Sequence, residues 1–476
     1  MSIFGLTPEN HFARLPGDFY TAMAAEKVGT QPRLIHANAK AAALIDLDPK
    51  SFQDPAFVEI FSGHRPFPGA EPLAMVYSGH QFGVWAGQLG DGRALLIAQL
   101  RNRKGELWDV QLKGSGKTPY SRFGDGRAVM RSTIREYLCS EAMAALNIPT
   151  SRALAIVATG EGVQREKDEP GAVLTRLARS HIRFGHFEHF HHKGRQHEVK
   201  LLADHLIGEY FPGLEGDYAG WFGAVVKRTA ELMADWQAVG FAHGVMNTDN
   251  MSILGLTLDY GPFGFLDAYD PGFICNHTDE AGRYSFDNQP SIGHWNLRAL
   301  AVALSGLIPT EALVEKLGAY ESFFVGRYRA LLRAKFGLTE VREDDDQLMG
   351  GLLGLMVRAR ADYTLTFRGL AGRDEAWLSL FGDLRNEAQA WAGRWLERVG
   401  DADRVAGAMN AVNPKYVLRN WVAETAIRAV EDRGDVAMLG RILTMLQSPF
   451  DEQADNAEFA APPPPDLCGL EVSCSS

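Results

Sequence analysis

The fold that we predict for this chain rests on two neighbouring stretches, residues 243–250, which read HGVMNTDN, and residues 259–261, which read DYG. The side chains of Asp249, Asn250 and Asp259 in these stretches end in carboxylate or amide groups. Hard oxygen atoms of this kind are the ligands that Mg²⁺ prefers next to nucleotide phosphates. The two stretches therefore predict a loop that holds a metal ion against a phosphorylated substrate.

The residues before this loop predict an antiparallel hairpin and a helix. Residues 94–100 and 108–113 are rich in apolar side chains, and the polar turn between them contains a glycine, which is typical of a β-hairpin. Apolar residues recur at helical spacing over 131–147, just before a proline, and predict a helix. Lys113 then ends a strand, and Glu136 lies in the following helix.

These groups occur in the same order as the signature residues of protein kinases, namely a strand lysine, a helix glutamate that pairs with it, H-R-D-L-x-x-x-N and D-F-G. Each match is weak by itself, but the ordered combination favours a kinase-like chain. In register with H-R-D, however, Val245 stands where a kinase keeps the aspartate that accepts the proton of the substrate hydroxyl. Asp249 offers a carboxylate in the same loop, and on chemistry alone it is either the base or a group that supports the loop or the metal.

The pattern along the chain predicts two lobes and a tail. Beyond residue 295 the apolar residues follow helical spacing almost throughout. The predicted helices of this lobe and of the segment before the loop cover residues 221–239, 296–307, 311–335, 347–361 and 421–431. We therefore expect an α+β, two-lobed protein-kinase-like fold, with a β-rich N-terminal lobe over 1–180 and a mostly helical C-terminal lobe over 181–448. Residues 449–476 are acidic and proline-rich and predict a mobile tail.

Composition excludes several classes of protein. The 476 residues include 46% hydrophobic and 22% charged side chains, as in an ordinary folded protein. A net charge of -11 gives no broad basic surface for nucleic acid or for an anionic membrane. The chain has neither a secretory start nor an apolar run long enough to cross a bilayer, and its four cysteines are too few for a disulfide scaffold. We expect a cytoplasmic protein without nucleic-acid or membrane partners.

Two further features have structural interpretations. Six histidines between residues 181 and 197 match no recognised zinc spacing, so we interpret this stretch as a solvated loop. Tryptophans 391, 395 and 421 lie in helical patterns and are interpreted as core residues.

On a set of longer segments the sequence resembles the selenoprotein O family of kinase-like protein adenylyltransferases, over nearly the whole chain. The segments that carry the resemblance are residues 77–83 (YSGHQFG), 87–93 (GQLGDGR), 111–116 (QLKGSG), 121–127 (SRFGDGR), 180–185 (SHIRFG), 243–250 and 259–262 (DYGP). The resemblance implies transfer of AMP from ATP to serine, threonine or tyrosine hydroxyls of other proteins, with release of pyrophosphate. It also implies that ATP is bound in the opposite sense to a kinase.

The resemblance implies a set of site residues as well. The nucleotide-contacting residues would be Gly90, Gly92, Arg93, Lys113, Asp125, Gly126, Arg176, Arg183 and Asp259. Asp249 would be the catalytic base, and Asn250 and Asp259 would bind Mg²⁺, with Mn²⁺ as an alternative. An arginine fork matches phosphate oxygens, and glycine lets backbone N–H groups approach them closely.

Three other functions stay open on the sequence. The protein could use UTP instead of ATP, since nothing readable fixes the base. A kinase that transfers the γ-phosphate is disfavoured by Val245, and an inactive nucleotide-binding scaffold is disfavoured by retention of Lys113, Asn250 and Asp259 together. A reversible disulfide between Cys275 and Cys474 that closes the cleft is a further hypothesis, weighed against the interpretation of both as ordinary thiols.

Overall fold

The predicted hairpin lies at the centre of an antiparallel β-sheet. The computed structural model describes residues 1–470 and 472. Strand β6 (Ala94–Arg101) pairs antiparallel with β7 (Leu107–Lys113), with Lys113 opposite Ala94, which confirms the hairpin. Alternate side chains of β6 enter different cores, because Leu95 and Ile97 pack on one face of the sheet and Leu96 packs on the other.

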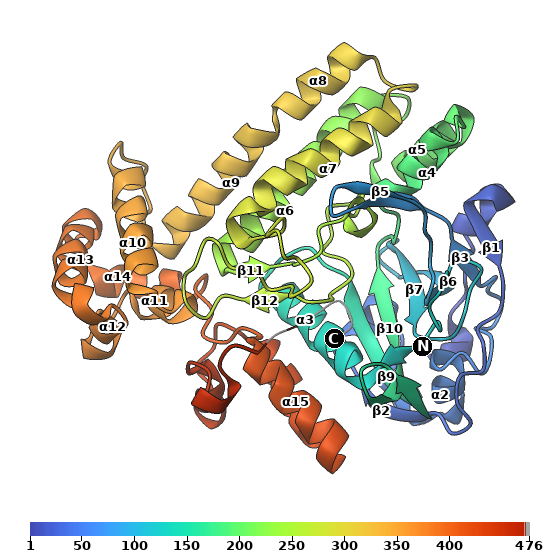
Figure 1. Ribbon diagram of the computed structural model, residues 1–476, viewed down its shortest axis with the longest axis horizontal. Helices are drawn as coiled ribbons and strands as arrows, with labels where there is room; N and C mark the ends of the chain where they lie inside the picture. Colours follow the sequence, from blue (N-terminus) through green and yellow to red (C-terminus); the bar gives the residue numbers. More distant parts are fainter. Residues whose placement is uncertain (471, 473–476) are drawn as a thin grey trace.

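The sheet extends on both sides of this hairpin in the order β1-β3-β6-β7-β10-β9-β2, and β8 pairs with β10. Its other strands are β1 (Tyr20–Ala22), β2 (Arg33–Ala37), β3 (Leu73–Met75), β8 (Ala128–Val129), β9 (Arg152–Gln164) and β10 (Asp168–Ala178). Two short hairpins lie outside it, formed by β4 (Ser78–Gln81) with β5 (Val84–Gln88) and by β11 (Phe241–Ala242) with β12 (Gly264–Phe265). In Figure 1 the sheet occupies one end of the molecule and most helices lie above it or at the other end.

Helices cover both faces of the sheet. The helix predicted over 131–147 is α3 (Met130–Ala145), which packs across β9 and β10 and buries one face in the larger core. On the opposite face lie α1 (Ala39–Leu44) and α2 (Pro55–Phe61), which contribute to a separate core. Because β10 is the neighbour of β7 in the sheet, this packing brings Glu136 of α3 to Lys113 at the end of β7.

The central helices are α4 (Phe184–His192), α5 (Gln196–Tyr210), α6 (Tyr218–Val239), α7 (Gln289–Leu304), α8 (Thr310–Gly318) and α9 (Tyr320–Lys335). Helix α6 ends at Gly240, whose φ of 71° gives a left-handed cap directly after residue 239, where the predicted helix ends. The single helix predicted over 311–335 is wrong in one respect, because the chain breaks at Ala319 into α8 and α9. Its apolar pattern continues across the break, so periodicity alone does not reveal it.

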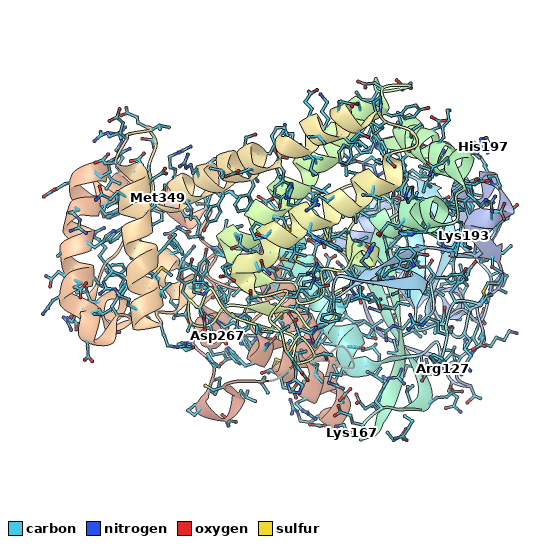
Figure 2. All side chains as sticks on the ribbon, turned by 45° about the horizontal axis from the view of Figure 1, so that its top comes forward. Arg127, Lys167, Lys193, His197, Asp267 and Met349 are labelled. Carbon is cyan, nitrogen blue, oxygen red and sulfur yellow. The ribbon has the colours of Figure 1, made fainter. Side chains whose placement is uncertain are left out.

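The remaining helices are α10 (Asp345–Ala359), α11 (Tyr363–Gly369), α12 (Glu375–Ser379), α13 (Arg385–Val399), α14 (Ala402–Asn410), α15 (Asn420–Arg433) and α16 (Val436–Leu446). Helices α10 to α14 enclose their own core around the buried Trp391 and Trp395, as predicted for these tryptophans. Figure 2 places Met349 of α10 far from Arg127 and Lys167, at the opposite end of the molecule. Helices α15 and α16 return to pack on α3, and the buried Trp421 belongs to the larger core.

Two interpretations of the sequence need correction. The histidine-rich stretch is not a solvated loop, because residues 184–192 form α4 and the rings of His186 and His189 are buried. The expected tail is in contact with the helices as far as it is described: Phe459 is buried and stacks on Trp421, and Glu452 pairs with Arg368 at 2.7 Å. These contacts of Phe459 and Glu452 hold the segment against the helices, although its composition alone predicts a mobile tail.

Cys275 is buried, and its thiol donates to the carbonyl of Ala242 at 3.5 Å. Cys474, the other residue of the hypothetical disulfide, lies outside the described residues. Within residues 1–470 and 472, none of the helices has the length and apolar character needed to cross a membrane.

Candidate active site

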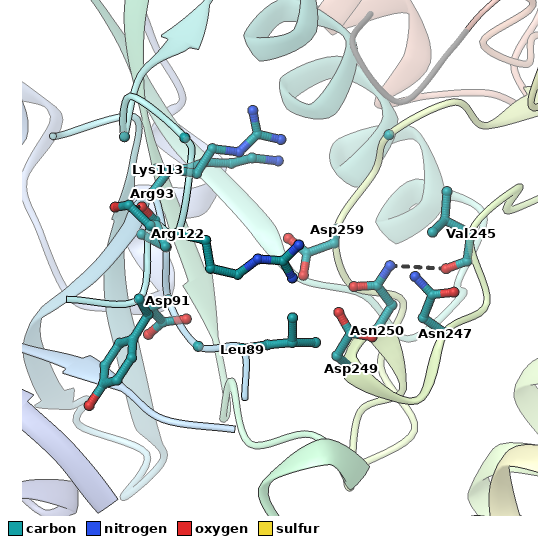
Figure 3. Close-up of a pocket in the computed structure, with 18 of the residues that line it drawn as sticks. Leu89, Asp91, Arg93, Lys113, Arg122, Val245, Asn247, Asp249, Asn250 and Asp259 are labelled. Carbon is teal, nitrogen blue, oxygen red and sulfur yellow. Dashed lines mark hydrogen bonds between the residues drawn. The ribbon is translucent and has the colours of Figure 1, made fainter. Parts of the chain in front are cut away.

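A cleft of about 890 Å³ opens between the sheet and the loop that follows α6. Every site residue that the sequence predicted lines it: Gly90, Gly92, Arg93, Lys113, Asp125, Gly126, Arg176, Arg183, Asp249, Asn250 and Asp259. In Figure 3 Lys113, Arg93 and Arg122 extend from the sheet side, and Asp249, Asn250 and Asp259 face them from the loop side. The fold thus gathers residues that are as much as 169 positions apart in the sequence.

Lys113 is held at the end of β7 by the glutamate that the sequence proposed as its partner. Its Nζ donates to Oε2 of Glu136, a side chain of α3 that is almost completely buried. Arg176, on the neighbouring strand β10, donates to the other oxygen of Glu136 at 3.2 Å and also contacts Gln111. Burial lowers the pKa of Lys113, while the charge of Glu136 opposes this shift.

Asp259 lies between two arginines. Arg176 donates to its Oδ1, and Nη2 of Arg183 lies 2.7 Å from its Oδ2. Burial by itself would raise the pKa of Asp259, but Arg183 and Arg176 outweigh it and hold the pKa well below the usual value. The backbone of Asp259 has a φ of 58°, a left-handed conformation that costs energy for a non-glycine residue and directs this carboxylate between the two guanidinium groups.

The loop over residues 243–250 is braced from within. Asn250 donates from Nδ2 to the carbonyl of Val245 at 3.0 Å, the contact drawn as a dashed line in Figure 3. The Oδ1 of Asn247 accepts from the backbone N–H of Phe82 at 3.0 Å and from the hydroxyl of Tyr284 at 2.7 Å. These bonds fix the loop against the β4–β5 hairpin and leave the amide oxygen of Asn250 available in the cleft.

Asp249 is a buried carboxylate that is only half satisfied. Its Oδ2 accepts from Nε2 of Gln81 at 3.1 Å, whereas its Oδ1 has no hydrogen-bond partner within the described part of the chain. Burial raises the pKa of Asp249 to about 6, with the neighbouring charge of Asp259 adding to the effect. A carboxylate with a free oxygen and a pKa of this kind is able to accept a proton near neutral pH.

Two glycine-containing loops close the sheet side of the cleft. A Cβ on Gly90 would lie 2.5 Å from the ring of Tyr120, and one on Gly126, whose φ is 72°, would lie 2.2 Å from the backbone of Gly116. Glycine is therefore required where these loops pack together. Asp125 accepts from Arg165 at 2.7 Å, so this predicted nucleotide contact is already engaged at the edge of the cleft.

Several lining residues were not assigned a role from the sequence. The hydroxyl of Tyr77 accepts from Nη1 of Arg183 at 2.6 Å, Gln81 holds Asp249, and the buried Asp91 accepts from the backbone N–H of Met75 at 3.1 Å. Tyr77 and Gln81 lie within residues 77–83, one of the segments that carry the family resemblance. Their residue types did not indicate a chemical role. Their partners are more than 100 positions away, so no local spacing could have shown these contacts.

The cleft thus places cationic side chains on the sheet opposite carboxylates on a facing loop, an arrangement that is able to bind phosphate groups. Comparison with known proteins gives the family. The family model described as protein adenylyltransferase SelO matches residues 3–447, and the chain belongs to this family.

Relatives of known class align with this chain over nearly their full length. A protein nucleotidyltransferase YdiU of Bordetella avium is 52% identical, in an alignment that covers 99% of this chain and 98% of the relative. Proteins of the same description from Myxococcus xanthus and Pseudomonas fluorescens are 51% and 49% identical, again with at least 98% of each chain covered. The protein is thus an enzyme of the nucleotidyltransferase class.

Proposed function

We propose that this enzyme transfers AMP from ATP to serine, threonine or tyrosine hydroxyls of other proteins and releases pyrophosphate. The observation that carries the proposal is the position of Asp249, a buried and only half-satisfied carboxylate that lines the same cleft as Lys113, Arg176 and Arg183. A base on one side and phosphate-binding cations on the other suit an attack on a phosphorus atom of a bound nucleotide. The family description supports an adenylyl group as the group transferred.

In the proposed reaction the acceptor hydroxyl oxygen forms a bond to the α-phosphorus of ATP. The bond between that phosphorus and the bridging oxygen to the β-phosphate breaks, and pyrophosphate leaves with its negative charge. Asp249 takes the hydroxyl proton. Lys113, Arg93, Arg176 and Arg183 stabilise the charge on the phosphates, and Glu136 positions Lys113.

We propose that Asn250 and Asp259 hold a divalent cation, Mg²⁺ or Mn²⁺, together with the phosphates. The donor set suits such an ion, because Asp259 and Asn250 supply hard oxygens and Mg²⁺ commonly takes one or two carboxylates plus substrate phosphates. Residues 1–470 and 472 contain no cluster of three or more histidine, cysteine or acidic side chains that would form an all-protein site. When bound, the ion would neutralise phosphate charge and orient the leaving group.

The architecture proposed for this chemistry is the two-lobed kinase-like one, with lobes over 1–180 and 181–448 and the terminal segment over 449–476. The strand lysine, its helix glutamate and the Asp259 loop meet at the cleft between the sheet and the helices, which supports this division. Val245 lines the cleft where a kinase would place its proton acceptor, which supports transfer from the α-position.

Labelled nucleotides test the proposal directly. The protein is incubated with a generic protein substrate, a divalent metal and ATP labelled at either the α- or the γ-phosphate, and with α-labelled UTP in a parallel reaction. Label on protein from α-labelled ATP is the expected result. Transfer from the γ-position alone would identify a kinase, preferential transfer from UTP would identify a uridylyltransferase, and no transfer from any of them would identify a scaffold.

A further inference from the structure

A second cavity of about 450 Å³ lies beside α4, α7 and α8. Among the described residues it shares no lining side chain with the cleft. Its walls are mostly apolar, and the side chains that form them are Trp295, Ala299, Val302, Leu313, Val314 and Leu317. A concave apolar space of this size is typical of a site for a small molecule.

One buried acidic side chain reaches this apolar space. Glu188 of α4 lines the cavity, and its side chain is only 2% exposed. Its Oε1 accepts from Nδ1 of His80, but its Oε2 is buried and has no hydrogen-bond partner in the described chain. An acceptor left unsatisfied in this way costs free energy, because the carboxylate loses water without gaining a donor.

The other polar groups at the cavity do not meet this need. The other polar side chains of the lining do not bond to Oε2; they are His191, His192, Arg298, Ser305 and Thr310. Among the described residues, Glu188 is the one acidic side chain of the lining. Because a carboxylate oxygen can only accept, the missing partner must be a hydrogen-bond donor.

We propose that this cavity binds a small apolar molecule that carries one hydrogen-bond donor, such as a ring N–H, an amine or a hydroxyl. The apolar body contacts the walls formed by α7 and α8, and the donor is directed to Oε2 of Glu188. This site is separate from the proposed nucleotide cleft, so its existence does not depend on which nucleotide the enzyme uses.

Indole and benzofuran test the proposal, because they have nearly the same shape and differ in an N–H donor against an ether oxygen. Saturation-transfer NMR titrations of the full chain measure the dissociation constant of each. Indole is expected to bind roughly ten-fold more tightly, as follows for one hydrogen bond to a charged group. Equal affinity of the two compounds, or no binding of either, would overturn the proposal.

Variants assign the binding to this cavity. Glu188→Met keeps the side-chain length and removes the acceptor, so the ratio of the two affinities should fall to about one. The matched control is Glu315→Met, at an exposed position on α8, which should leave the ratio unchanged. Leu313→Trp fills the cavity without altering Glu188 and should abolish binding of both compounds. Binding that persists in Leu313→Trp, or a ratio that survives in Glu188→Met, would contradict the assignment.

Discussion

Arg183 and Asp259 form an ion pair of 2.7 Å between Nη2 and Oδ2, and the arginine is almost completely buried. Arg176 occupies the other oxygen of the same carboxylate. In the proposed reaction a nucleotide and a metal ion would offer each group a new partner, phosphate for the arginines and a cation for Asp259. The ion pair therefore keeps Arg183 positively charged and Asp259 negatively charged, and the proposed reaction needs both groups in these states.

Asp259→Ala and Asp249→Ala are expected to separate binding from chemistry. Loss of Asp259 should abolish metal-dependent ATP binding and transfer together, because it removes a proposed metal ligand. Loss of Asp249 should lower transfer by about 10²–10⁴-fold with ATP affinity retained, as for a general base. Calorimetric titration with ATP and metal measures the binding affinity, and transfer of the α-label to protein measures the rate of the reaction. Asp235→Ala, which removes an ion-paired acid of α6 that does not line the cleft, is the control. Equal loss of ATP binding in the two cleft variants would place Asp249 among the metal ligands.

The rate of transfer should fall as the pH is lowered through about 6. Burial raises the pKa of Asp249 to about 6, and only the ionised carboxylate can accept the hydroxyl proton. Below this pH each further unit should reduce the rate about ten-fold, because the ionised fraction falls in that proportion. The pH profile of kcat with saturating ATP measures the effect. A rate that is constant between pH 5 and 7 would exclude Asp249 as the base.

Gln81→Leu should move this acidic limb to higher pH. The Gln81 amide donates to Oδ2 of Asp249 and favours its ionised form, so removing the donor should raise the pKa of Asp249 further. A shift of roughly one pH unit is expected for a hydrogen bond to a charged group. Gln88→Leu, on the exposed end of the same hairpin, controls for changes in β4 and β5. A lower rate with an unshifted pH profile would mean that Gln81 acts in some other way.

Asp249→Asn should stabilise the fold at alkaline pH while it lowers transfer as much as Asp249→Ala does. The folded-state pKa of Asp249 is raised above its ordinary value of 3.8, so the folded protein binds this proton more tightly than the unfolded chain. Its contribution to stability is therefore lost as the pH rises to about 6. The buried charge then costs up to about 3 kcal/mol. Thermal unfolding should show a higher Tm for the variant at pH 8 and little difference near pH 4. A lower Tm at pH 8 would contradict this account.

Gly126→Ala should weaken ATP binding by at least about ten-fold. The new Cβ would lie 2.2 Å from the carbonyl carbon of Gly116, so the loop that lines the cleft must move. Gly105→Ala is the matched control, since Gly105 also has a positive φ, of 81°, but has open space around the new atom. Similar ATP affinities in the two variants would show that the packing of this loop does not affect the site.

Much of the local structure could be predicted from the sequence. The β6–β7 hairpin, helix α3 and the end of α6 at Gly240 follow from short-range pattern and from the conformational freedom of glycine. The predicted contact between Lys113 and Glu136 is confirmed as well. This contact could be predicted because the order of the residue types along the chain matches the order of the kinase motifs.

The sequence by itself thus determined the β6–β7 hairpin, α3, the end of α6 and the family to which the motif residues point. Only the tertiary structure decided which oxygen of Asp249 is satisfied by Gln81, that both arginines meet on Asp259, and that α4 and Phe459 are buried. The physical reason is that periodicity reports interactions within a few residues, whereas these contacts join segments far apart in the chain. Their burial and charge, and hence the raised pKa of Asp249, exist only once those segments pack together.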